Sequence, residues 1–93
     1  MLNIPLLLRL RIKHPHGLHI RPATTIVKHL SQYKADVFFT CEETAANAKS
    51  IISLLSLAAS GNAEITVSAE GEDAALALDS LLTMSDSFFE EVF

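Results

Sequence analysis

The chain has 93 residues, of which 49% are hydrophobic, and its formal net charge at pH 7 is -4. This length suits one compact domain, so we expect residues 1–93 to form a single domain with a modest core and its chemistry at the surface. The Lys and Arg residues are scattered over residues 9–49 rather than clustered, which argues against nucleic acid or an anionic membrane surface as a partner.

The N-terminal stretch and the cysteine usage bear on the cellular compartment. Residues 1–8 are apolar but lack a basic start and are followed by Arg9 and Arg11, which does not fit a secretory signal. No apolar run approaches the ~20 residues that a membrane helix needs. Cys41 is the only cysteine, and we interpret it as a small buried strand residue. We therefore expect a cytoplasmic protein without membrane insertion.

The first half of the chain alternates between strand and helix patterns. Residues 8–13 alternate apolar and basic side chains, which predicts a half-buried strand over 6–13, and residues 14–17 then break it. Helical spacing predicts a first helix from about Ile20 to Tyr33. Residues 36–41 and 44–47 are predicted to form a pair of strands joined by a polar turn.

The second half continues the same alternation. Ser50 is predicted to cap a short helix of about ten residues that ends before Gly61. A strand follows over 64–70, and Glu72 and Asp73 then open a last helix. The order βαββαβα predicts an α/β (α+β) fold, an open-faced β-sandwich in which a four-stranded antiparallel sheet carries three helices on one face.

The residues 17–23, Gly-Leu-His-Ile-Arg-Pro-Ala, lie at the predicted start of the first helix, since Pro22 favours a first helical turn. The backbone N–H groups of Ile20 and Arg21, the positive end of the helix dipole and the Arg21 guanidinium all suit a phosphoryl group on His19. The same dipole disfavours the imidazolium form and keeps the ring nucleophilic near pH 7.

Two other interpretations of these residues remain open. His19 also fits an ordinary polar cap, with Arg21 as a solvated surface residue. A metal site is suggested by the proximity of His14, His16 and His19, but Pro15 and the change from strand to helix would separate the rings. No Cys, Asp or Glu nearby completes a ligand set. We therefore expect neither a metal nor another cofactor.

Two motifs in this order resemble the HPr family, the histidine-containing phosphocarriers of the phosphoenolpyruvate-dependent sugar phosphotransferase system. The first, similar to the family's phosphorylation signature, is Gly17-Leu18-His19 with Arg21-Pro22-Ala23. The second, similar to its regulatory segment, is Asn47-Ala48-Lys49-Ser50-Ile51 followed by Leu54, Ser56, Leu57 and Ala58. The likeness runs from about Leu8 to Met84.

The resemblance implies a cycle in which phosphorylated enzyme I transfers its phosphoryl group to Nδ1 of His19 and an enzyme IIA protein then removes it. His19 would be the nucleophile and acceptor, and Arg21 would position the phosphoryl group. The chain would be a phosphoryl-transfer protein with a phosphohistidine intermediate rather than a stand-alone enzyme, because a surface histidine without a substrate pocket needs its partners for alignment. We expect a monomer.

The second motif has its own alternatives. As an N-cap, Ser50 would stabilise the second helix by ~1 kcal/mol. The resemblance implies that it is also a target of HPr kinase/phosphorylase, whose phosphate would block docking rather than unfold the chain. If partly exposed, Ile51, Leu54 and Leu55 would form the docking patch for partners, although Leu54 and Leu55 fit core packing equally well.

A second function is consistent with the same residues. An HPr-like regulator, whose phosphorylation state signals to nitrogen or transcriptional control rather than sugar uptake, would also need His19. The chain departs from the family in having Ile20, where Ala is more usual after the active histidine. Its tail, 85–93, is longer and more aromatic than expected, and it either extends the last helix or contacts a partner.

Overall fold

A computed structural model describes residues 5–13, 20–57 and 63–91 of the chain, and the elements lie in these three stretches. In chain order they are β1 (Leu6–Ile12), α1 (Ile20–Leu30), β2 (Asp36–Cys41), β3 (Thr44–Asn47), α2 (Ile51–Ser56), β4 (Glu64–Glu70), α3 (Ala74–Phe88) and β5 (Phe89–Glu91). The helices α1 and α2 are shorter than predicted. α1 ends at Leu30, and a turn follows in which the Tyr33 N–H donates to the Leu30 carbonyl at 3.1 Å.

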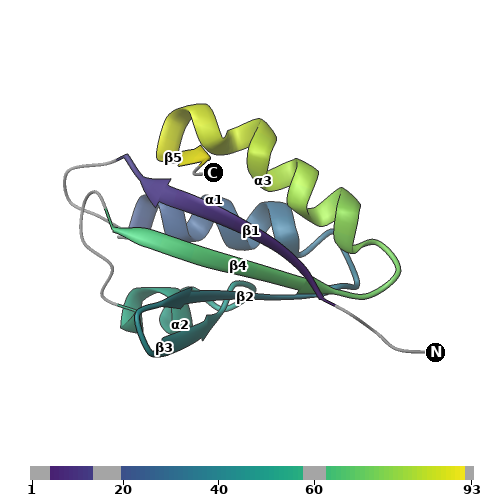
Figure 1. Cartoon of the computed structure of the whole chain (residues 1–93), viewed down its shortest axis with the longest axis horizontal. Coiled ribbons are helices and arrows are strands. Elements are labelled where there is room, and N and C mark those ends of the chain that lie inside the picture. The colour runs from purple at the N-terminus through teal and green to yellow at the C-terminus, as the bar shows by residue number, and fades with distance from the viewer. Residues whose placement is uncertain (1–4, 14–19, 58–62, 92–93) are drawn as a thin grey trace.

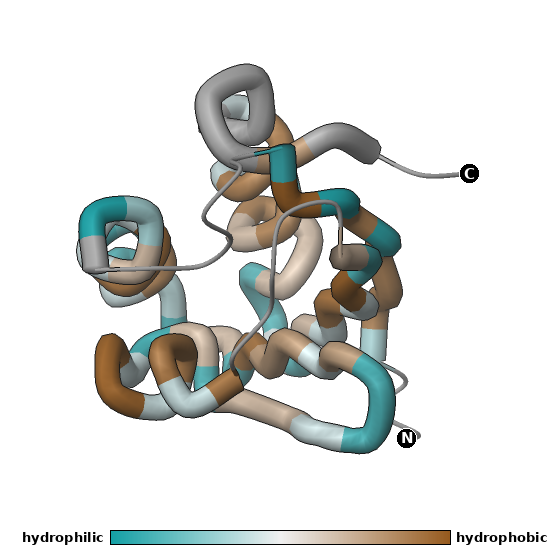
Figure 2. The backbone as a smooth tube through the Cα atoms, turned by 90° about the vertical axis from the view of Figure 1, so that its left-hand side faces the viewer, coloured by the Kyte–Doolittle hydropathy of each residue, from teal (hydrophilic) through white to brown (hydrophobic). Residues whose placement is uncertain are grey.

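The strands form one sheet in the order β3-β2-β4-β1-β5, and every pairing in it is antiparallel. The strands lie in front of α1 in the view of Figure 1, and Figure 2 shows the helices end-on along one side of the sheet. The predicted open-faced sandwich, with its four antiparallel strands and three helices on one face, is therefore confirmed. Within the described residues, a fifth strand that the sequence analysis did not predict lies at the outer edge of β1.

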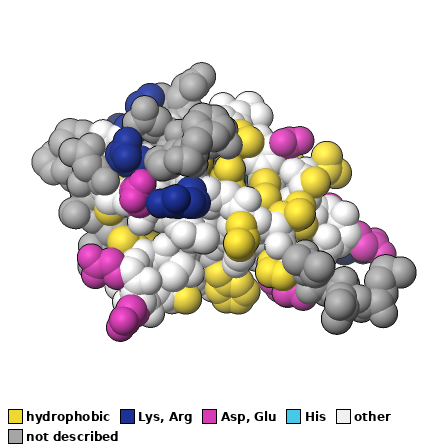
Figure 3. Space-filling model, in the orientation of Figure 1, with side chains coloured by type: hydrophobic (Ala, Val, Ile, Leu, Met, Phe, Trp, Pro, Cys, Tyr) yellow, Lys and Arg dark blue, Asp and Glu magenta, His cyan; other side chains and the backbone are white. Residues whose placement is uncertain are grey.

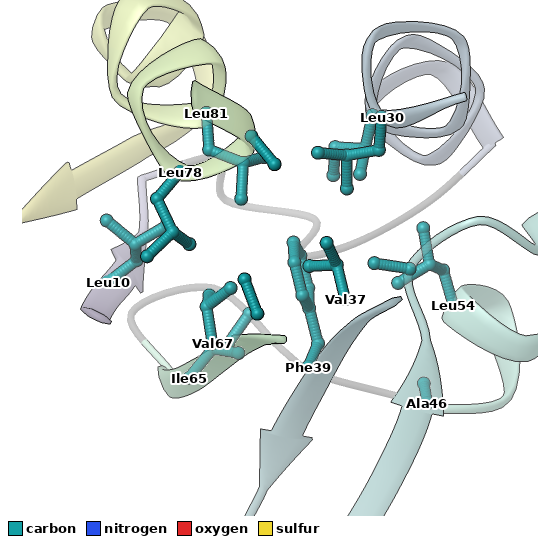
Figure 4. Packing of buried hydrophobic residues seen from close by; sticks show 14 of the residues in the cluster. Leu10, Leu30, Val37, Phe39, Ala46, Leu54, Ile65, Val67, Leu78 and Leu81 are labelled. Carbon is teal, nitrogen blue, oxygen red and sulfur yellow. The ribbon is translucent and has the colours of Figure 1, made fainter. Parts of the chain in front are cut away.

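The core lies between the sheet and the helices. Alternate residues of the strands point toward the helices, since successive side chains of a strand lie on opposite faces. Figure 4 shows Phe39 and Val67 of the sheet facing Leu30 of α1, Leu54 of α2 and Leu81 of α3. All five side chains are buried. This layer of apolar contacts holds the three helices against one side of the sheet.

The C-terminal tail has a structural role within the fold. α3 extends to Phe88, as one of the two predictions had it, and the chain then turns back as β5 and pairs with β1, in a register that sets Phe89 opposite Ile12. The Phe89 ring is buried and packs edge-to-face on Phe39, with ring centroids 6.1 Å apart. The tail thus completes the sheet edge and adds an aromatic side chain to the core.

A tight junction joins the start of β2 to the start of α3. The Asp73 carboxylate accepts hydrogen bonds from the backbone N–H groups of Lys34 and Ala35, both at 2.8 Å. The Lys34 N–H is the main cause that lowers the Asp73 pKa, with the Ala35 N–H acting in the same direction. Gly71 has φ of 140°, and a Cβ there would lie 2.9 Å from the Ala35 Cα. Asp73 therefore ties two layers together, in addition to its predicted place at the helix start.

Candidate functional site

The start of α1 is the first part of the candidate site. The helix begins at Ile20, as predicted, directly after His19 in the sequence. His19 lies outside the described residues, as do His14 and His16. Pro22 is buried in the first turn, where its missing N–H costs no helical hydrogen bond, whereas Arg21 is exposed. The helix therefore presents a guanidinium to solvent two residues beyond His19.

The charge distribution along α1 favours an anion at its N-terminal end. Its first turn contains no acidic residue, and its last turn contains Lys28 and His29. The first backbone N–H groups of an α-helix have no acceptor within the helix, and the dipole places partial positive charge there. With no carboxylate in the first turn to satisfy these groups, an anionic phosphoryl group from outside would be stabilised by them.

His29 gives a useful contrast within the same helix. Its side chain is half-buried, and its Nδ1 lies 3.4 Å from the Ser80 Oγ of α3. The packing of α3 against α1 covers part of the ring. Its position in the last turn, at the negative end of the dipole, is unsuited to a phosphoryl group.

The start of α2 is the second part of the candidate site. Ser50 is the N-cap, as predicted: its backbone is extended, at φ -125° and ψ 118°, and its Oγ accepts from the Ser53 N–H at 3.2 Å. Its carbonyl accepts the first helical hydrogen bond, from the Leu54 N–H at 3.0 Å. The serine hydroxyl thus satisfies one of the backbone donors that a helix start leaves without an acceptor.

Further polar side chains, for which the sequence analysis predicted no hydrogen bonds, hold the start of α2 in place. The Asn47 N–H donates to the Ser53 Oγ and the Asn47 Oδ1 accepts from the Lys49 N–H, both at 2.9 Å. The Lys49 Nζ donates to the Tyr33 carbonyl at 2.5 Å, which links α2 to the end of α1. The spacing of Asn47, Ser50 and Ser53 around a predicted cap is the sequence signal that could have identified this network.

The predicted docking residues divide between surface and core. Ile51 is exposed and Leu55 is half-buried, but Leu54 is fully buried, so its predicted place in a docking patch is wrong. It lies on the face of α2 that packs toward Val37 and Phe39 (Figure 4). Ile52, which was not predicted, is 79% exposed. A residue two positions before a buried one lies on the opposite side of a helix, and this rule could have identified Ile52.

Cys41 and the histidines bear on the alternative chemistries. Cys41 is half-buried at the end of β2 rather than buried as predicted, because the strand end is only partly covered. Partial burial is the main cause that raises the pKa of the Cys41 thiol, and the carboxylate of Glu42 acts in the same direction. A raised pKa disfavours the reactive thiolate.

In the part of the chain that the structure describes, no group of three His, Cys, Asp or Glu side chains could hold a metal ion. Over those same residues, no helix meets the length and hydropathy that a membrane span requires.

Comparisons with known proteins agree on one family. A family model for the PTS HPr component phosphorylation site matches residues 8–86. The phosphocarrier protein HPr of Chlamydia muridarum is 40% identical over 81 residues, which cover 87% of this chain and 78% of that protein. The HPr-like protein Crh of Bacillus subtilis is 38% identical over 73 residues, which cover 78% of this chain and 86% of Crh.

A solved structure extends the likeness to three dimensions. The histidine-containing phosphocarrier protein of a Mycoplasma superimposes with a TM-score of 0.83 at 31% sequence identity, over 88% of this chain and 94% of that one. The matched span includes both helix starts described above, with Arg21, Pro22 and Ser50. The chain therefore belongs to the HPr family of phosphocarrier proteins.

Proposed function

We propose that this protein carries phosphoryl groups on His19, accepting them from phosphorylated enzyme I and passing them to enzyme IIA proteins of the sugar phosphotransferase system. The observation that carries the proposal is the start of α1. An exposed Arg21 and a first turn without acidic residues follow His19 directly, within a segment matched by the family's phosphorylation-site model. This environment favours an added phosphate over a bare positive ring.

The proposed step is an in-line transfer. A lone pair of the neutral His19 Nδ1 attacks phosphorus, and the bond from phosphorus to enzyme I breaks as the new bond forms. Arg21 and the first-turn N–H groups of α1 screen the negative charge on the phosphoryl oxygens. Enzyme I and enzyme IIA supply the alignment, since in-line phosphoryl transfer depends mainly on positioning.

Partner docking is proposed for the exposed apolar side of α2. Ile51 and Ile52 are exposed and Leu55 is half-buried, and α2 packs against α1, whose start follows His19. Isoleucine side chains beside a polar helix cap give an exposed apolar contact on the helix that packs against α1. Ile52 therefore takes the place in the docking surface that was predicted for the buried Leu54.

Ser50 is the proposed regulatory residue. Phosphorylation by an HPr kinase/phosphorylase would place about two negative charges at the start of α2, where backbone N–H groups can bind the phosphate oxygens. The helix would persist, because those oxygens can replace the hydroxyl as acceptor for the Ser53 N–H. The charge would lie beside Ile51, so the expected effect is weaker docking of enzyme I.

The test is phosphorylation with purified components. Wild type, His19→Ala and His29→Ala are each incubated with phosphoenolpyruvate and enzyme I, and intact mass spectrometry measures the phosphoryl adduct before and after acid treatment. Wild type and His29→Ala should gain one acid-labile group, and His19→Ala none. A wild type that gains nothing, or a His19→Ala chain that gains the group equally well, contradicts the proposal. Ser50→Asp should gain it more slowly than wild type.

A regulatory role is the second candidate, favoured by the likeness to the HPr-like protein Crh. Both roles use His19, so phosphorylation by enzyme I does not separate them. Transfer onward does: a sugar carrier passes its phosphoryl group rapidly to sugar-specific enzyme IIA proteins. If transfer reaches only an enzyme IIA protein of nitrogen or transcriptional control, the regulatory role is the correct one.

A further inference from the structure

The face of the sheet that carries no helix presents a row of residues across three strands, in which two large apolar side chains lie on either side of a serine. Phe38 of β2 pairs with Ser68 of β4, and Ser68 pairs with Leu7 of β1. These three residues therefore lie side by side on one face, with Phe38 42% exposed and Leu7 66% exposed. In Figure 3, hydrophobic side chains gather on this face beside a group of Lys and Arg side chains. Because only a small side chain separates them, these two exposed apolar side chains favour contact with another apolar surface.

The charges on either side of this row have opposite signs. Two residues along β1 from Leu7 lies Arg9, which forms an ion pair with Glu64 at 3.5 Å; Arg11 contacts the same carboxylate at 3.6 Å. On the other side of the row, the exposed Asp36 and Glu70 face each other across β2 and β4. Neither of these carboxylates forms an ion pair with a described residue. Like charges opposite each other in a sheet repel, so this acidic end favours an external cation.

The open face of one copy is complementary in charge to the same face of a second copy. Arg9 lies two residues to one side of the row, and Glu70 lies two residues to the other side, on the neighbouring strand. A two-fold axis along the row places a second copy face to face with its strands reversed, so that the basic end of each copy lies over the acidic end of the other. Arg9 and Glu70 of opposite copies are then about one strand spacing, ~4.8 Å, apart laterally, within reach of an arginine side chain.

We propose that the open face of the sheet is a self-association surface, on which a second copy packs through Leu7 and Phe38 while Arg9 of each copy pairs with Glu70 of the other. Arg9 then exchanges its own Glu64 for Glu70 of the other copy, and Glu64 keeps its contact with Arg11. Only two large apolar side chains per copy are buried, so the dimer is weak and is populated at high protein concentration. The helices lie on the opposite side of the sheet, so both copies keep α1 and α2 accessible. Association and phosphoryl transfer are therefore independent of each other.

The test uses charge reversal in two separate chains, Arg9→Glu and Glu70→Arg, with sedimentation velocity over a concentration series. In a homodimer of either variant, both cross-copy contacts pair like charges, so the dissociation constant should rise by about ten-fold or more over wild type. In an equimolar mixture, every contact joins a glutamate to an arginine. The mixture should therefore dimerise at least as well as wild type, although each variant alone does not.

The control is a charge reversal on the helix side. Asp79→Arg, at an exposed position of α3, should dimerise like wild type and should not restore association when mixed with Arg9→Glu. Phe38→Ser should abolish association, which gives a second measurement if a charge variant does not fold, as judged by circular dichroism. A wild type that sediments as a monomer throughout, or a mixture as monomeric as its two components, overturns the proposal.

Discussion

The two faces of the sheet are made from the same strands but have different composition and different roles. Phe38 and Phe39 are neighbours in β2, yet Phe38 is 42% exposed and Phe39 is fully buried. Side chains on the helix-covered face are apolar and interlock with three helices, whereas those on the open face include arginines, threonines and a serine. Stability therefore depends mainly on the side chains that face the helices. The side chains on the open face contribute less to stability and can instead serve in binding.

The largest effect that tests this contrast comes from the two phenylalanines. Phe39→Ala should lower the free energy of unfolding by about 3–5 kcal/mol, because it leaves a cavity in the core. Phe38→Ala should lower it by only about 1 kcal/mol, because the ring is partly exposed and leaves no enclosed cavity. Urea unfolding followed by circular dichroism measures both. Equal losses at the two positions would mean that the open face is covered in the folded protein.

A similar pair lies in α2. Leu54→Ala should cost about 2–5 kcal/mol, since its side chain is buried against β2. Ile52→Ala should leave the unfolding free energy nearly unchanged but slow phosphoryl transfer from enzyme I, because the exposed side chain is proposed to contact the partner. Unfolding and transfer rates measured on the same two variants separate these roles. A Leu54→Ala chain that is as stable as wild type but accepts the phosphoryl group slowly would show that Leu54, and not Ile52, contacts the partner.

The cap of α2 should give a smaller effect. Ser50→Ala should lower stability by about 1 kcal/mol, because it removes the acceptor of the Ser53 N–H. Ser50→Asn retains a capping oxygen and should stay close to wild type in thermal unfolding. Neither variant can be phosphorylated at this position, so a kinase that still modifies them would act elsewhere.

The junction at Asp73 should give a small, pH-dependent effect. Its pKa is lowered in the folded chain, mainly by the Lys34 N–H, so its contribution to stability is present above the ordinary Asp pKa of about 3.9 and is lost as pH falls through the lowered value. Asp73→Asn should therefore be less stable than wild type at pH 7, with the difference shrinking toward pH 2. Glu72→Gln, one residue earlier, is the control. A difference that persists undiminished in acid would assign it to packing rather than charge.

Local patterns were sufficient to predict most of the elements. Alternation identified β1 and β4, Pro22 placed the start of α1, and the Ser50 hydroxyl identified the start of α2. These features act within a few residues, so they are visible in sequence. They could also suggest His19 as the reactive residue, although His19 lies outside the described residues.

What could not be predicted depends on residues far apart in the chain. β5 forms because β1 offers it an edge, and a three-residue strand has no pattern of its own. Leu54 is buried because of the side of α2 that meets the sheet, which local spacing did not determine. The Asp73 carboxylate likewise reaches Lys34 and Ala35 only because the fold brings two loops together.

The pairing of β1 has a consequence for how the chain folds. Its hydrogen-bonded neighbours are β4 and β5, so the first strand finds its partners only in the last third of the sequence. Long loops must close before these pairs form, which costs entropy in advance of the contacts that repay it. The hairpin of β2 and β3 pairs locally and escapes that delay. We expect β1 to join the sheet late in folding, and its backbone amides to become protected from hydrogen exchange after those of the hairpin.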